Sequence, residues 1–248
     1  MRATIYKSWT VHPQVCNIKV KRRLRGVAVA LLSMLIPATV TAQDKFEISL
    51  GAEVVSKYVW RGFDQASGTS VQPSLGLAYK GISLSAWGST SVTDLEPKEL
   101  DLTLAYGIGR FGIAVTDYWW SGESGKYGHY KESHYFEGAL SYNFGDKVPL
   151  TLSAAMMFAG ADKNPDGDQN FSAYFNAAYD IACPGKVTLT PSVGISTKSY
   201  MYTGEKISGF TDISLKAAKE VKVTDSFLIP IFVQFIVSPV MDKTYLIF

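Results

Sequence analysis

The feature that most constrains this chain is an alternation of apolar and polar residues that begins near residue 46 and recurs almost to residue 248. In the first segment, Phe46–Arg61, apolar side chains occupy the even positions, whereas Glu47, Glu53 and Lys57 occupy odd ones. A two-residue period is typical of a β-strand with one apolar face. No segment shows a helical apolar stripe longer than two turns, so the sequence predicts an all-β fold.

The alternating segments are separated by connections that are tight and long in turn, such as Lys80-Gly81 and then Ser121–Ser133. Short periplasmic turns and longer extracellular loops are typical of outer-membrane barrels, so we expect a closed antiparallel up-and-down transmembrane β-barrel of about 12 strands. Pro73, Pro191 and Pro230 fit poorly, because a closed barrel has no edge at which a missing N–H is tolerated. The predicted strands are Phe46–Arg61, Val71–Lys80, Ile82–Val92, Glu99–Gly107, Phe111–Trp120, His134–Phe144, Leu150–Gly160, Asn170–Asp180, Val187–Thr197, Gly209–Ala218, Phe227–Val237 and Lys243–Phe248.

The first 42 residues differ from the rest: seven are basic and none is acidic, and the basic stretch runs into the apolar segment 27–36. Small residues at Val40 and Ala42 predict cleavage before Gln43, so residues 1–42 are expected to be a signal peptide and residues 43–248 an outer-membrane β-barrel. Removing the leader leaves 17 basic against 22 acidic residues, which changes the net charge from +2 to −5. The remaining chain has no basic stripe for nucleic acid, and its expected partner is outer-membrane lipid.

The polar faces favour a membrane barrel over a soluble sandwich. Only 39 of the 206 residues after the leader are charged, and the polar faces are rich in Ser, Gly and Thr, which suits a crowded lumen better than solvent. The expected aromatic belts at the two bilayer interfaces comprise Tyr58, Trp60 and Trp119 at the long-loop end, and Tyr79, Tyr106, Phe111, Tyr142, Phe144 and Tyr179 beside the tight turns.

Charged residues on the polar faces should point into the lumen, because a charge facing lipid costs about 2–4 kcal/mol near the bilayer midplane. The expected lumen-facing residues, which either line a pore or form a plugging network, are Glu53, Lys57, Arg61, Glu99, Asp101, Glu137 and Asp212. Arginine can hold two carboxylates through its forked guanidinium. We therefore expect Arg61 to organise this network, with Glu99, Asp101 and Glu137 as candidate partners.

The stretch Ser56-Lys57-Tyr58-Val59-Trp60-Arg61-Gly62-Phe63-Asp64-Gln65 resembles the opening of TorF-type porins, a family of small outer-membrane β-barrel proteins. Ala86–Ser89, Glu99–Leu102 and Tyr135–Tyr142 extend the resemblance, in the expected order, over about the first half of the chain after the leader. The resemblance implies an outer-membrane barrel with a pore.

Two other patterns in the sequence could carry chemistry. His129 and His134 lie in or beside a loop, and His134 follows Ser133, but neighbouring residues on a strand point to opposite faces. Asp162–Asp168 matches the first half of a calcium loop, yet position twelve is Ala173 instead of Glu. We therefore predict no catalytic residues, no metal site and no cofactor.

Two functions remain open from the sequence. The first is a narrow passive channel for small polar solutes. The second is a non-conducting structural or surface-binding barrel with functional extracellular loops, and an outer-membrane lipid-modifying enzyme ranks below both. The sequence does not identify the solute, the oligomeric state or an extracellular partner.

Overall fold

The computed structural model describes residues 46–93, 98–121, 127–200, 206–224 and 227–248. The predicted signal peptide, residues 1–42, lies outside these ranges. No helix among the described residues is long and apolar enough to cross a membrane.

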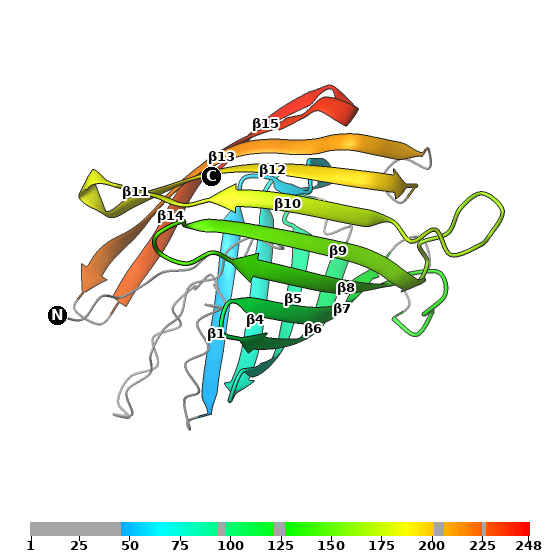
Figure 1. Cartoon of the computed structure of the whole chain (residues 1–248), viewed down its shortest axis with the longest axis horizontal. Coiled ribbons are helices and arrows are strands. Elements are labelled where there is room, and N and C mark those ends of the chain that lie inside the picture. Colours follow the sequence, from blue (N-terminus) through cyan, green and yellow to red (C-terminus); the bar gives the residue numbers. More distant parts are fainter. Residues whose placement is uncertain (1–45, 94–97, 122–126, 201–205, 225–226) are drawn as a thin grey trace.

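The described chain is an antiparallel up-and-down sheet that curls into a nearly closed barrel (Figure 1). The main path runs in the order β1-β4-β5-β6-β7-β8-β9-β10-β12-β13-β14-β15, and the short β11 pairs with β12. The predicted all-β antiparallel barrel is thus confirmed at the level of the fold. Its strands are β1 Glu47–Val55, β4 Ser70–Tyr79, β5 Ile82–Ser91, β6 Lys98–Ile108, β7 Phe111–Trp120, β8 His134–Asn143, β9 Leu150–Gly160, β10 Ala173–Tyr179, β11 Ile181–Cys183, β12 Val187–Ser199, β13 Ile207–Thr224, β14 Phe227–Ser238 and β15 Lys243–Ile247.

The first and last strands meet at one point, where the Ser56 amide donates to the Phe248 carbonyl at 2.8 Å. The Phe248 amide returns a hydrogen bond to the Ser56 hydroxyl at 3.1 Å. Beside this seam, Val55 from β1 packs in a buried apolar cluster with Ile236, Tyr245 and Ile247 from β14 and β15. Backbone hydrogen bonds and side-chain packing therefore join the two ends of the sheet.

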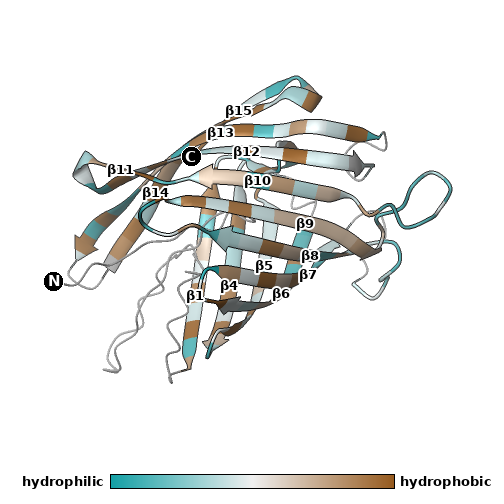
Figure 2. Ribbon diagram, in the orientation of Figure 1, coloured by the Kyte–Doolittle hydropathy of each residue, from teal (hydrophilic) through white to brown (hydrophobic). Residues whose placement is uncertain are grey.

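The distribution of side chains is the reverse of that in a soluble barrel. Along β6, Leu102, Leu104 and Tyr106 are exposed on the outer face, whereas Glu99 and Asp101 are buried on the inner face. The other strands repeat this arrangement, and apolar and polar residues alternate along the ribbons (Figure 2). Apart from apolar side chains such as Trp87, Met157 and Ile236, the inner surface is polar and buried, and the outer surface is apolar and exposed.

The segment after β1 departs from the sequence prediction. The first strand ends at Val55 instead of continuing to Arg61, and the connection to the next predicted strand contains two short strands. Strands β2 (Tyr58–Trp60) and β3 (Phe63–Ala66) form a separate two-stranded sheet. Arg61 (φ 50°) and Gly62 (φ 82°) form its turn, and two left-handed residues are the geometry that closes tight hairpins.

The β2–β3 hairpin lies inside the barrel. Tyr58, Trp60 and Ala66 share a buried cluster with Trp87 of β5, Tyr118 of β7 and Met157 of β9. At its tip, a side-chain carbon on Gly62 would come within 1.8 Å of the Thr211 carbonyl oxygen on β13. The hairpin thus contacts β5, β7, β9 and β13, and strands this far apart in the sheet can contact one segment only if that segment lies in the interior.

Two other departures concern the strand ends and the prolines. Strand β13 extends from Ile207 to Thr224, well beyond the predicted Gly209–Ala218, and pairs with β14 from Ile213 to Thr224. Pro73, Pro191 and Pro230 all lie within paired strands, opposite Ala52, Leu215 and Glu220.

Candidate functional site

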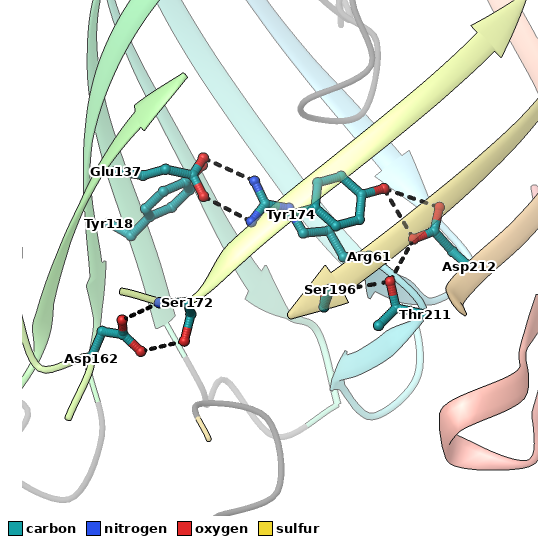
Figure 3. Close-up of polar contacts among 9 residues, drawn as sticks. All are labelled: Arg61, Tyr118, Glu137, Asp162, Ser172, Tyr174, Ser196, Thr211 and Asp212. Atoms are coloured by element: carbon teal, nitrogen blue, oxygen red, sulfur yellow. Dashed lines mark hydrogen bonds and ion pairs between the residues drawn. The ribbon is translucent and has the colours of Figure 1, made fainter. Parts of the chain in front are cut away.

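Arg61 and Glu137 form a buried ion pair in the interior. Arg61 Nη1 donates to Glu137 Oε2 at 2.7 Å, and Nη2 donates to Oε1 at 2.9 Å (Figure 3). Only 5% of the Arg61 side chain and 1% of the Glu137 side chain are exposed. A bidentate pair of this kind fixes the orientation of both groups, so it attaches the hairpin tip to β8.

Two aromatic rings flank the same guanidinium. Its central carbon lies 4.3 Å from the ring centroid of Trp60 and 4.2 Å from that of Tyr174. Both distances are within the range in which a ring face attracts a cation. The guanidinium is therefore held by a carboxylate and by two π-faces, one from the hairpin and one from β10.

Hydrogen bonds continue from these groups into the barrel wall. Tyr118 donates to Glu137 Oε1 at 3.0 Å, and Tyr174 donates to the two carboxylate oxygens of Asp212 at 3.0 and 3.1 Å. Thr211 donates to Asp212 Oδ1 at 3.1 Å. We call this group the Arg61 cluster. It joins the hairpin to β7, β8, β10 and β13 (Figure 3), and its members are Arg61, Tyr118, Glu137, Tyr174, Thr211 and Asp212.

A bulge and a glycine make room for the β10–β13 side of the cluster. Gly194 pairs with Asp212 and Ile195 with Phe210, so Thr211 is an extra residue in β13, and both Thr211 and Asp212 are buried. A side-chain carbon on Gly194 would lie 2.1 Å from Asp212 Oδ1 and 2.4 Å from the Tyr174 hydroxyl oxygen. Only glycine at position 194 therefore leaves space for the Tyr174–Asp212 hydrogen bonds.

The other charged residues that were predicted to face the lumen lie on several strands of the wall. Of the three candidate partners of Arg61, the structure brings Glu137 into contact, whereas Glu99 accepts a hydrogen bond from Tyr58 at 3.2 Å. Asp101 is buried on the same inner face of β6 as Glu99. Glu53 is buried on β1, as is Lys216 on β13, whose ammonium lies 3.9 Å from the ring centroid of Phe232.

Lys57 does not belong to this interior set. Its ammonium donates to Asp64 at 2.5 Å across the hairpin, and about a third of each side chain is exposed, 32% and 31%. Because β1 ends before Lys57, this residue leads into the hairpin instead of belonging to the wall, and its position on the lumen side stays a prediction.

The predicted aromatic belts divide into two groups. Tyr58 and Trp60 are only 3% exposed, so their assignment to a lipid-facing belt is wrong, since the hairpin carries them into the bore. Trp119 and Tyr142 are half-buried on the outer face. The exposed members of the predicted belts are Tyr79, Tyr106, Phe111, Phe144 and Tyr179.

Sequence reasoning missed Tyr118, Tyr174, Thr211 and the two glycines Gly62 and Gly194. Tyr118 and Tyr174 looked like ordinary strand residues. The one available signal was the Arg61-Gly62 dipeptide between Trp60 and Phe63, because a residue pair ending in Gly between alternating aromatics is typical of a hairpin turn.

A second polar group lies on the outer face of β7 and β8. His134 Nδ1 lies 2.8 Å from Asp117 Oδ1, and Nε2 contacts the Tyr127 carbonyl oxygen. Ser133, next to it in sequence, donates instead to the His129 carbonyl at 3.1 Å. Ser133 and His134 therefore do not form a nucleophile and base pair in this structure.

The calcium-like segment is organised as a hydrogen-bonded loop. Asp162 accepts from the Ser172 amide at 2.8 Å and from its hydroxyl at 2.6 Å, as Figure 3 shows. Asn164 Oδ1 accepts from the amides of Asp166 and Asp168 at 3.0 and 2.9 Å. Across the described ranges, no group of three or more His, Cys, Asp or Glu residues is placed to hold a metal ion.

Comparison with known proteins adds no relative: no protein-family model, no curated protein and no solved structure matches this chain.

Proposed function

We propose that this protein is an outer-membrane β-barrel that acts as a narrow passive channel for small polar solutes, with the β2–β3 hairpin as its constriction. Residues 1–42 would serve as a cleaved export signal. Outer-membrane lipid would surround the barrel.

The observation that carries the proposal is the reversed distribution of side chains. The inner face contains Glu53, Glu99, Asp101, Glu137 and Asp212, all buried, and the outer face exposes a continuous set of Leu, Ile, Val and Phe. A soluble barrel with this surface would expose far more apolar area than monomeric proteins tolerate, whereas in a bilayer the same surface contacts hydrocarbon. A polar interior is typical of barrels that pass water-soluble molecules.

The hairpin supports a narrow path. It is connected to the barrel wall by side-chain contacts, chiefly those of the Arg61 cluster, and belongs to a sheet of its own. A segment held in this way can restrict the bore without being part of the wall.

Conductance in planar bilayers tests the proposal, using protein purified from outer membranes after expression of the full chain. We expect small conductance steps with cations favoured over anions, because acidic residues outnumber basic ones on the inner face. A complete lack of current, from the native protein and from variants in which the hairpin is displaced, would contradict a channel.

The second candidate, a non-conducting barrel whose loops act outside the cell, is favoured by one observation. Arg61, Glu137 and Tyr118 are almost fully enclosed, which is typical of a packed plug. A lipid-modifying activity ranks third, because both ring nitrogens of His134 already contact acceptors. Incubation with labelled phospholipid tests this third function directly.

A further inference from the structure

We propose that the solutes admitted by this bore are organic cations with a guanidinium group, and that Arg61 is a tethered occupant of their binding site. The inference rests on the proposed channel function and names its substrate class. It follows from the arrangement of Glu137, Tyr118, Tyr174 and Trp60 around the Arg61 guanidinium, which we call the cage. It also follows from the carboxyl groups on the inner face and from the attachment of Arg61 to the hairpin.

The cage matches a planar, forked cation. Glu137 offers both carboxylate oxygens, at 2.7 and 2.9 Å from two guanidinium nitrogens, and Tyr118 orients this carboxylate by its own hydrogen bond. The ring of Tyr174 covers one face of the guanidinium. A compact ammonium ion cannot make two parallel hydrogen bonds to one carboxylate, so the geometry selects guanidinium over lysine-like amines.

Most of the cage belongs to the barrel wall and not to the hairpin. Glu137 lies on β8, Tyr118 on β7 and Tyr174 on β10, whereas only Trp60 and Arg61 itself come from the hairpin. Because the hairpin has no backbone pairing with the wall strands, its displacement would leave the carboxylate and one π-face in place.

Carboxyl groups outnumber basic groups on the inner face that surrounds and extends beyond the cage. Asp212 accepts a hydrogen bond from Tyr174, and Glu53, Glu99 and Asp101 are buried elsewhere on the inner face, where Lys216 is also buried. Two buried acceptors on neighbouring strands, Glu53 Oε2 and Gln72 Oε1, have no hydrogen-bond partner among the described residues. Glu53 and Gln72 are directly opposite each other in the β1–β4 register, so these acceptors form a polar strip along the inner wall.

Chemical rescue tests the site itself. Replacing Arg61 by Ala empties the cage, and guanidinium chloride at tens of millimolar should then raise the melting temperature of the barrel by about 4 °C. Sodium chloride at the same ionic strength should have no such effect. The native protein, whose cage is occupied, should not respond to guanidinium, and R61A with E137Q, which lacks the carboxylate, should not respond either.

A second measurement covers the case in which the R61A barrel is too unstable for a melting temperature to be measured. The refolding yield of R61A and of Arg61→Met, which keeps the aliphatic stem, is measured with guanidinium or sodium present. A higher yield with guanidinium supports the site. An equal effect of the two salts, or a guanidinium effect that persists with E137Q, overturns it.

Permeation separates this inference from the channel proposal. Reversal potentials of R61A under opposed guanidinium and sodium gradients should give at least a tenfold preference for guanidinium, lost with E137Q. If guanidinium stabilises R61A but no variant conducts current, the channel is contradicted and the guanidinium-binding site stands. If R61A conducts current without preferring guanidinium, the substrate class is contradicted and the channel proposal stands.

Discussion

At the scale of single residues, the interior depends on Arg61 and Glu137. Both ions are removed from water, so the pair depends on its bidentate geometry. Tyr118 donates a further hydrogen bond to the carboxylate, and the rings of Trp60 and Tyr174 lie against the guanidinium. Removing one partner of such a pair is far more costly than removing both, because the survivor is left as an uncompensated buried charge.

A double-mutant cycle checks this interpretation. We expect Glu137→Gln to lower the free energy of unfolding by about 3–5 kcal/mol, and the double variant with Arg61→Met to recover a large part of that loss. Urea titration of the folded barrel in detergent, followed by tryptophan fluorescence, gives the values. Equal and additive losses would mean that the two side chains do not interact.

At the scale of elements, the hairpin is the part of the fold that the sequence did not predict. Val54, Tyr58 and Trp60 keep the apolar face, with Ser56 as the one interruption, so periodicity alone extends the first strand to Arg61. Alternation reports that one face of a segment is apolar but not which surface that face meets. Here the aromatic face meets the interior cluster of Trp87 and Tyr118 instead of lipid.

The hairpin tip provides a direct test of the constriction. Gly62→Ala places a carbon 1.8 Å from the Thr211 carbonyl oxygen, and neither backbone can yield without moving the tip. We expect larger conductance steps than those of the native protein. Gly109→Ala is the matched control, since Gly109 also has a positive φ but a carbon there meets no atom within 4 Å. Unchanged conductance in Gly62→Ala would argue that the hairpin does not restrict the path.

The loop Tyr127–Ser133 is held on the outer face by His134. Its Nδ1 lies 2.8 Å from Asp117 Oδ1, and its Nε2 contacts the Tyr127 carbonyl oxygen at the start of the loop. Loss of a charge-assisted hydrogen bond costs about 1.5–3 kcal/mol, so Asp117→Asn should speed amide exchange in this loop by about tenfold or more. Hydrogen exchange with mass spectrometry measures this, with Glu132→Gln as the control. Equal exchange rates in the two variants would mean that Asp117 does not hold the loop.

At the scale of the whole molecule, the sequence predicted the architecture well and the site only in part. Strands Phe111–Trp120 and Leu150–Gly160 have their predicted ends, because their alternation stops at clear turn residues. The contacts of Arg61 with Tyr174 and of Gly194 with Asp212 depend on the curvature of the sheet and on the bulge at Thr211, neither of which a local pattern encodes.

The central claim is that the apolar faces of the strands meet lipid and the polar faces meet the bore, and site-directed spin labelling along β6 tests it most directly. Single cysteines are introduced into a Cys183→Ser background, and the protein is reconstituted in bilayers. Labels at Leu102, Leu104 and Tyr106, which are exposed on the outer face, should collide frequently with dissolved oxygen, which concentrates in lipid. Labels at Thr103 and Ala105 should collide rarely, which gives a two-residue period. Collision rates that are highest at Thr103 and Ala105, or equal at all five positions, would contradict the account.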